Sequence, residues 1–216
     1  MPALRLVLAS ASPARLATLR QAGLRPEVIV SGVDETLIAG LTAAEQACQL
    51  AVLKAQAVAE RLAHQPRPAH RTDRDVTVVV GCDSLLELDG RAYGKPGTAA
   101  LAEERWRLMR GKSAILHTGH HLMVMRENSV TARTCGAATT VHFANLSDAE
   151  IKAYVATGEP LAVAGAFTVD GLGGPFVTRL EGDYHNVVGI SLPLLRRLLA
   201  DLGVRWIDLW AAGAAQ

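Results

Sequence analysis

The stretch Val76-Thr77-Val78-Val79-Val80-Gly81-Cys82-Asp83-Ser84 decides the fold class of this chain. Its first five residues are all β-branched, which favours a strand that is buried on both faces at the centre of a sheet. The polar residues Asp83 and Ser84 follow at the expected carboxyl end of this strand. Ligands of open α/β sheets bind outside the carboxyl ends of the strands. The stretch therefore predicts a central strand, over 76–80, that carries a carboxylate into a binding site.

The rest of the chain predicts hairpins and crossover helices around this strand. Capping residues, apolar periodicity and turn residues predict the boundaries. Strands are expected at 5–9, 27–30, 85–88 with 91–94, 117–125 and 130–143, and helices at 13–22, 42–64, 98–110, 147–158 and 193–203. An exposed loop is expected at 65–75, and a bent strand pair or a flexible loop at 167–177. We predict one α/β domain over 1–216, with a mixed central sheet and flanking helices.

Composition and length exclude several functional classes. The 216 residues carry 22 basic and 21 acidic side chains, so no general basic field favours nucleic acid or anionic membranes. No apolar run approaches the roughly 20 residues of a membrane span, and none resembles a signal-peptide core. We therefore expect a cytoplasmic protein with no nucleic-acid or membrane partner. The widely spaced Cys48, Cys82 and Cys135 are expected to be free thiols.

A candidate anion site lies at the start of the first expected helix. Ser12 precedes Pro13 and is well suited to cap this helix, while Ser10 and Arg15 add a hydroxyl and a cation. Hydroxyls, free backbone N–H groups and a cation at a helix N-terminus suit a phosphate. A simple capped helix is the alternative interpretation.

Two carboxylates and two lysines form a second candidate set. Asp83 and Glu35, together with phosphate oxygens, would make a magnesium or manganese site. Lys95 lies in the rigid turn Gly94-Lys95-Pro96, and Lys54 lies in an otherwise apolar helical stretch, so each could hold a phosphate as a point charge. Taken singly, a turn aspartate and solvated lysines would be the simpler interpretation.

Three tempting motifs fail on their spacing. Gly111-Lys112-Ser113 resembles the end of a Walker A loop, but Trp106 stands where that loop needs a glycine. The glycines between Gly171 and Gly174 do not match a dinucleotide-binding pattern and do not open a helix. On a strand, His120 would point away from His117 and His121, which argues against a histidine metal site.

Taken together and in order, short motifs resemble the Maf nucleotide pyrophosphatases, a family first named for inhibition of septum formation. The sequence as a whole resembles actinobacterial members of this family. The matching pieces are Leu8-Ala9-Ser10-Ala11-Ser12-Pro13 with Arg15, Val33-Asp34-Glu35, Lys54-Ala55, Gly81-Cys82-Asp83-Ser84, Gly94-Lys95-Pro96, Met109-Arg110-Gly111 with His117-Thr118-Gly119, Gly158-Glu159-Pro160, Ala164-Gly165-Ala166-Phe167 and Asn186-Val187-Val188-Gly189.

The resemblance implies an elongated α/β fold with two lobes around a cleft, similar to the inosine triphosphate pyrophosphatases, and often a homodimer. The implied reaction cleaves a nucleoside triphosphate between the α and β phosphorus atoms with a divalent metal, magnesium or manganese. Carried over by position, Asp83 is the general base and Glu35 the acidic residue near the metal. The implied triphosphate contacts are Ser10, Arg15, Lys54 and Lys95.

This chain departs from the family pattern at three places that bear on the substrate. Ala14 stands where many members have the first of two arginines. Val163-Ala164-Gly165 stands where the pyrimidine-directed branch has Lys-Ala-Gly. Asp170 stands where that branch has glutamine, and it is expected to face the base. Together with the strand-end carboxylates and cations, the resemblance implies a pyrophosphatase that removes noncanonical or surplus nucleotides. The alternative is a nucleotide-binding regulator of cell division with little catalysis.

Overall fold

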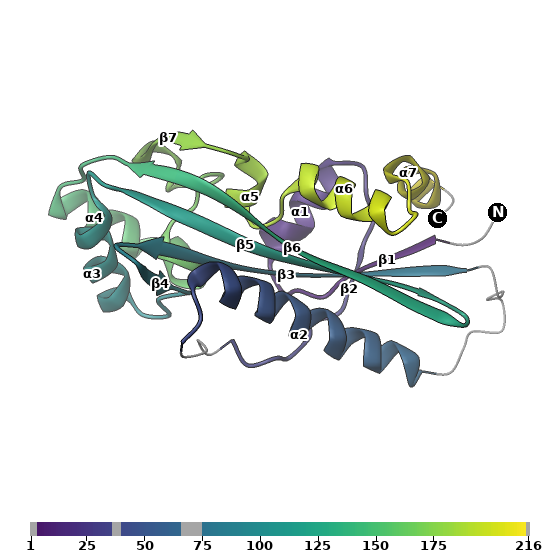
Figure 1. Cartoon of the computed structure of the whole chain (residues 1–216). Helices are drawn as coiled ribbons and strands as arrows, with labels where there is room; N and C mark the ends of the chain where they lie inside the picture. The colour runs from purple at the N-terminus through teal and green to yellow at the C-terminus, as the bar shows by residue number, and fades with distance from the viewer. Residues whose placement is uncertain (1–3, 36–39, 66–74, 215–216) are drawn as a thin grey trace.

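The sheet is built around two long strands, β5 (Ser113–Arg126) and β6 (Ser129–Phe143), in a computed structural model that describes residues 4–35, 40–65 and 75–214 (Figure 1). Seven strands pair in the order β2-β1-β3-β5-β6-β7, and β4 pairs with β3. The other strands are β1 (Leu4–Leu8), β2 (Glu27–Val28), β3 (Val76–Leu88), β4 (Arg91–Tyr93) and β7 (Val177–Glu181). β1 is parallel to β2 and β3, and the remaining pairs are antiparallel. The mixed α/β sheet is confirmed.

Strand β3 is longer than the sequence suggested. It continues through the expected end at Val80 to Leu88, because it pairs with β5 from Thr77↔Met125 to Glu87↔Ile115. The predicted strand at 85–88 is therefore the second half of β3, and Asp83 lies inside the strand rather than at its end. The Asp89-Gly90 turn to β4 is as expected.

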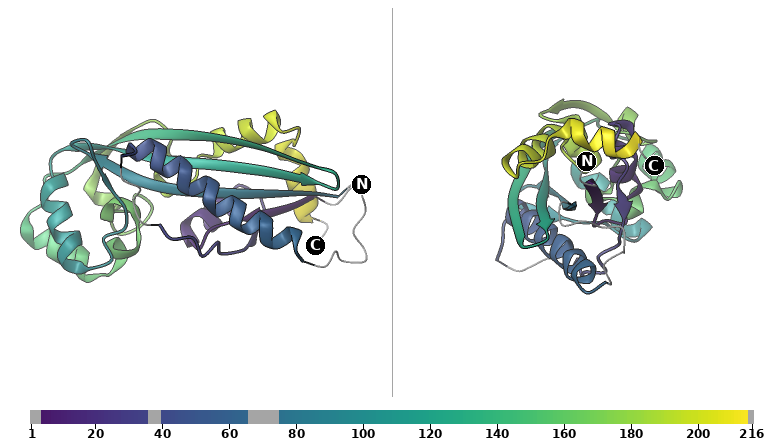
Figure 2. Two further views of the ribbon diagram at one scale, coloured as in Figure 1. Left: turned by 60° about the horizontal axis from the view of Figure 1, so that its bottom comes forward. Right: turned by 90° about the vertical axis from the view of Figure 1, so that its right-hand side faces the viewer.

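Helices cover both faces and one end of this sheet (Figures 1 and 2). Helix α2 (Ala43–Ala63) lies along one face, and α1 (Pro13–Gln21), α6 (Leu192–Asp201) and α7 (Trp206–Ala214) lie over the other. Helices α3 (Ala99–Met109) and α4 (Asp148–Ala156) pack together at the far end. None of the described helices combines the length and apolar character that a membrane span requires.

Three hydrophobic cores are present among the described residues: two form the two lobes, and the third packs α2 against β1 and β3. The core of one lobe packs α6 and α7 against the first half of β3 and its neighbours. The core of the other lobe surrounds the fully buried Trp106 of α3, whose ring makes edge contacts with Phe143, Tyr154 and Phe176 at 5.5, 5.6 and 5.9 Å. The Trp106 indole N–H donates to the Ala166 carbonyl at 2.8 Å, so this core is also tied to the loop after α4. The long strands connect the two lobes.

Local capping signals predicted the helix starts well. Ser12 caps α1, and the capping boxes of Thr42 with Glu45 and of Ser147 with Glu150 both form. All three cysteines are free, as expected.

Other expectations were wrong or lie outside the described residues. Of the two alternatives for 167–177, the strand pair does not form: residues 167–176 are a loop that includes the 3₁₀ turn Gly174–Phe176, and Val177 begins β7. Helix α6 is not the last helix, because α7 follows it, and the short helix α5 (Tyr184–Val188) was not predicted. The expected loop at 65–75 falls mostly outside the described residues; of its ends, Gln65 is exposed and Asp75 is buried.

The backbone of α2 approaches the sheet closely at two glycines. A Cβ on Gly81 would lie 2.2 Å from the Ala51 carbonyl oxygen, and a Cβ on Gly119 would lie 2.2 Å from the Ala47 carbonyl oxygen. Both contacts are with helix backbone, so no side-chain movement could relieve them. The helix therefore packs at this distance only because the strands carry no side chain there.

We expect Gly119→Ala to destabilise the fold by about 3 kcal/mol or more, because overpacking against backbone forces α2 away from the sheet. Gly136→Ala is the matched control: Gly136 pairs with Gly119 on β6, but its Cβ would meet only the Cys48 thiol, at 3.3 Å. Urea unfolding of both variants measures the difference. Equal stability of the two variants would contradict the backbone contact.

Candidate active site

A cavity of about 780 Å³ lies along an open edge of β3. β1 pairs with β3 only as far as Leu8↔Val80, and β4 joins at Leu86↔Tyr93. Between these points, in the part of the chain that the structure describes, residues 81–85 have a strand neighbour only on the β5 side. The predicted site residues that line the cavity are Ser10, Ser12, Arg15, Glu35, Asp83, Lys95 and Asp170.

The open edge of β3 explains how the consecutive residues Asp83 and Ser84 can both line the same cavity. Successive side chains of a strand point to opposite faces. Asp83 meets Lys54 of α2 on one face, whereas Ser84 accepts from Arg15 of α1 on the other, at 2.9 Å. Because no strand blocks this edge, both side chains also border the cavity.

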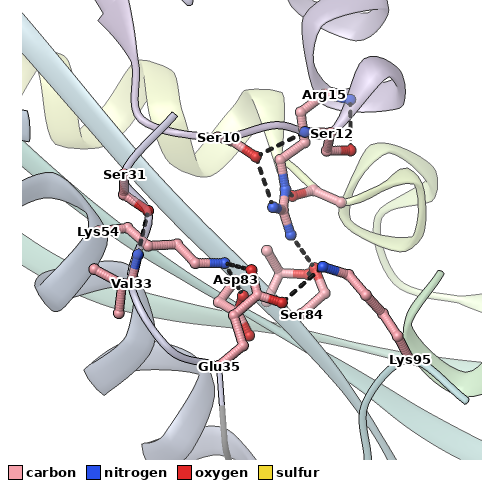
Figure 3. Close-up of polar contacts among 12 residues, drawn as sticks. Ser10, Ser12, Arg15, Ser31, Val33, Glu35, Lys54, Asp83, Ser84 and Lys95 are labelled. Atoms are coloured by element: carbon pink, nitrogen blue, oxygen red, sulfur yellow. Dashed lines mark hydrogen bonds and ion pairs between the residues drawn. The ribbon is translucent and has the colours of Figure 1, made fainter. Parts of the chain in front are cut away.

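Lysines and carboxylates alternate at one wall of the cavity (Figure 3). The Lys54 ammonium donates to Asp83 Oδ1 and, at 2.6 Å, to Glu35 Oε1. The Lys95 ammonium donates to Glu35 Oε2 at 2.6 Å. The side chains of Lys54 and Asp83 are only 5% and 9% exposed, whereas that of Lys95 is 53% exposed. Lys54 is therefore a fixed, buried partner of the carboxylates, whereas the exposed Lys95 can exchange Glu35 for a ligand.

Glu35 is held as a carboxylate by its two lysines. Burial alone would raise its pKa, but the hydrogen bonds and charges of Lys54 and Lys95 outweigh burial and lower the pKa to about 2. Its loop is tied to α2 by the Arg61 guanidinium, which donates to the Val30 carbonyl. Glu35 is thus ionised at neutral pH and suits a cation rather than proton donation.

Arg15 is a buried cation surrounded by neutral acceptors. Its Nε donates to the Gly189 carbonyl at 2.7 Å, Nη1 to Ser10 Oγ at 3.1 Å and Nη2 to Ser84 Oγ at 2.9 Å. Among the described residues, no carboxylate lies within ion-pair distance of Arg15. Its charge is therefore available to an anion in the cavity, next to the N-terminus of α1 that Ser12 caps.

A network of buried hydrogen bonds, not predicted from the sequence, holds the segment 186–189, whose Gly189 carbonyl accepts from Arg15. Ser84 Oγ and Thr118 Oγ1 are hydrogen-bonded at 2.9 Å, and Thr118 donates to the Asn186 carbonyl at 3.1 Å. The fully buried Asn186 side chain donates to the Leu116 carbonyl and to Thr139 Oγ1, at 3.2 and 3.1 Å. The asparagine was visible in the sequence, but only as one motif residue among many.

Arg105 of α3 is a second missed residue of the cavity. Its guanidinium lies 5.0 Å from the centre of the Tyr93 ring and donates to the Gly94 carbonyl, and Nε has no hydrogen-bond partner among the described residues. Burial lowers its pKa. No sequence signal separated Arg105 from Arg107 and Arg110, which pair with surface carboxylates.

The three histidines of β5 have separate protein partners. His117 contacts Glu87 at 2.9 Å, and His121 contacts Thr134 Oγ1 at 2.7 Å. His120 accepts from the Ser191 N–H at 2.9 Å, and burial with the nearby Arg15 charge lowers its pKa to about 4. His120 is therefore a neutral packing residue at physiological pH.

Glu35 and Asp83 fit a magnesium or manganese ion that substrate oxygens would complete. Among the described residues, no three potential ligand side chains cluster as a protein-only site would require. Mg²⁺ is commonly held by one or two carboxylates plus substrate phosphates. Two adjacent carboxylates on a cavity wall provide this smaller donor set.

Comparison with known proteins agrees with the motif order. The family model described as Maf-like protein matches residues 5–202. A protein named nucleoside triphosphate pyrophosphatase from Salinispora tropica is 58% identical over 98% of this chain and 90% of its own length. Proteins of the same name from Cutibacterium acnes and Streptomyces coelicolor are 53% and 51% identical, over 94% and 97% of this chain and 93% and 96% of their own lengths. With the family model and these relatives matching nearly the whole sequence, the chain belongs to the Maf-like protein family.

Proposed function

We propose that this protein is a nucleoside triphosphate pyrophosphatase that hydrolyses the bond between the α and β phosphorus atoms, releasing a nucleoside monophosphate and pyrophosphate. The observation that carries the proposal is that Asp83, Glu35 and Lys95 line the same cavity as Arg15, with Lys54 hydrogen-bonded to both carboxylates. The names of the relatives support the same activity.

The cations divide into fixed and mobile groups for phosphate binding. Arg15 is immobilised by Ser10, Ser84 and Gly189, so it presents a preorganised charge. Lys95 is half exposed and can exchange Glu35 for a phosphate oxygen as the substrate enters. Ser10, Ser12 and the first turn of α1 add hydroxyl and backbone donors at the same end.

Asp83 is the group that we assign as general base. Lys54 contacts its Oδ1 and fixes its orientation, and Oδ2 is the atom we assign to accept a proton from the attacking water. Glu35 and Asp83 would hold a magnesium or manganese ion together with the phosphates. When bound, such an ion neutralises phosphate charge and stabilises the charge that develops in the transition state.

The physiological substrates that we propose are noncanonical or surplus nucleoside and deoxynucleoside triphosphates. A cell-division regulator that only binds nucleotides is the alternative. The alternative has no need of carboxylates beside the phosphate site, because lysines and arginine alone would bind the anion. The pairing of Asp83 and Glu35 with Lys54 therefore favours the enzyme.

If the metal and cations span a triphosphate as proposed, the primary products will be monophosphate and pyrophosphate. Incubation of the protein with a panel of canonical and modified triphosphates, with magnesium or manganese and ³¹P NMR detection, measures the products. Primary release of diphosphate and orthophosphate would reject this cleavage position.

Asp83→Asn is expected to fold normally and to lose turnover by a factor of roughly 10² to 10⁴, the usual contribution of general acid–base catalysis. The substitution keeps the size of the side chain but removes the proton acceptor. Asp89→Asn is the matched control, since Asp89 lies on the exposed turn after the same strand and pairs with Lys112. Near-normal turnover in Asp83→Asn would remove Asp83 from the mechanism as general base.

Asp170→Gln is expected to change the relative rates among triphosphates by about fivefold, the effect of one net hydrogen bond. Ionised aspartate only accepts hydrogen bonds, whereas glutamine also donates. Steady-state rates on the same panel test this, and an unchanged substrate profile would show that Asp170 does not contact the base.

A further inference from the structure

The Glu159 carboxylate lies at the cavity wall and accepts hydrogen bonds from the loop 168–173 and from Tyr154. It is the first residue of the 3₁₀ turn Glu159–Ala162. Oε2 accepts from the Leu172 N–H at 2.9 Å, and Oε1 accepts from the Gly173 N–H at 3.0 Å. The Tyr154 and Thr168 hydroxyls also donate to Oε1. The loop 168–173 is therefore folded around this one side chain.

The glycines of the loop are required by this arrangement. A Cβ on Gly171 would lie 2.4 Å from Glu159 Oε2, and a Cβ on Gly173 would lie 2.5 Å from the Tyr154 hydroxyl. The Tyr154 hydroxyl additionally accepts from the Thr168 N–H at 3.2 Å, so it ties α4 to the start of the loop. The glycine-rich loop 168–173 therefore owes its conformation to its close contacts with the Glu159 carboxylate and the Tyr154 hydroxyl.

The role of Glu159 is that of an internal anchor. Burial tends to raise its pKa, but the hydrogen bonds from Thr168, Leu172 and Tyr154 outweigh burial and lower the pKa. In the described part of the chain, no lysine or arginine lies within ion-pair distance of it. Glu159 therefore remains ionised near neutral pH, with both oxygens occupied by loop donors.

Asp170 lies inside the anchored loop, and it lines the cavity with Thr168. We infer that Glu159 is a positioning residue for substrate selectivity: it fixes the loop so that the Asp170 carboxylate faces an N–H donor on the nucleobase. This inference rests on the proposed function, since it assumes that the cavity holds a nucleotide with its base at the loop. The recognised group is a ring N–H or an exocyclic amino group, because a carboxylate can only accept.

The test begins with Glu159→Gln and hydrogen exchange of the loop amides. The amide side chain places an N–H₂ group against loop donors, so at least one of the contacts to Leu172, Gly173, Thr168 or Tyr154 is lost. We expect exchange of the Leu172 and Gly173 amides to accelerate roughly tenfold or more. Glu150→Gln is the control, because Glu150 lies on the preceding helix and glutamine preserves its capping box with Ser147.

The second measurement compares kcat and KM across the triphosphate panel. In Glu159→Gln we expect KM for the best substrate to rise roughly fivefold to tenfold, with kcat within about threefold, and the relative rates to shift in the same direction as in Asp170→Gln. The double variant should then resemble Asp170→Gln alone. If Glu159→Gln does not fold, Thr168→Val, which removes one donor to the carboxylate, replaces it.

The outcomes separate this inference from the proposed function. Unchanged amide exchange in the variant overturns the anchor, whatever the enzyme does. Faster exchange with an unchanged substrate profile, or additive effects in the double variant, overturns the link to selectivity. If the wild type hydrolyses no triphosphate, the proposed function fails, and calorimetric binding of triphosphates with a non-hydrolysable α,β bridge replaces the kinetic comparison; identical binding profiles then overturn the inference.

Discussion

The close packing of α2 on the sheet is the constraint on which the active site depends. At Gly81 and Gly119 the helix backbone lies where a side chain would otherwise stand. This distance brings Lys54, one turn beyond Ala51, into contact with Asp83 of β3 and Glu35 of the loop after β2. A helix held farther away would leave the Asp83 carboxylate buried without its partner, which costs several kcal/mol.

The interrupted pairing of β3 provides the second requirement, an opening in the sheet. The pairing of β1 with β3 ends at Leu8↔Val80. If β1 continued alongside β3, it would cover residues 81–85, and the Asp83 and Ser84 side chains would then face separate sides of a closed sheet. Because the pairing of β3 with β1 ends at Val80 and its pairing with β4 starts only at Leu86, the Asp83 and Glu35 carboxylates and the Arg15 site border one cavity. The two lobes lie on either side of this opening, each with its own core.

Local chemistry made some of this predictable from sequence, and nonlocal pairing made the rest unpredictable. The caps at Ser12, Thr42 and Ser147 need only neighbouring residues, so their helices were expected where they occur. The end of β3 depends on β5, about 30 residues later, and Asp83 was misplaced at a strand end for that reason. Arg105 bonds to a loop residue 11 positions away and had no sequence signal that distinguished it from a surface charge. Glu159 appeared only within a motif, and its partner Leu172 lies 13 positions away in a loop whose conformation the sequence did not predict.

The charges of the proposed site argue for the metal independently of the resemblance. The charged side chains at the cavity balance one another: four cations (Arg15, Lys54, Lys95 and Arg105) stand against four carboxylates (Glu35, Asp83, Glu159 and Asp170). A bound triphosphate brings about four negative charges, so protein and substrate alone would leave an excess of about four negative charges in a partly buried cavity. A divalent cation between the carboxylates and the phosphates would reduce this excess to about two. Lys95 would then be free to leave Glu35 for the phosphates, because the cation takes over the neutralisation of that carboxylate, while Lys54 keeps its contact with Asp83.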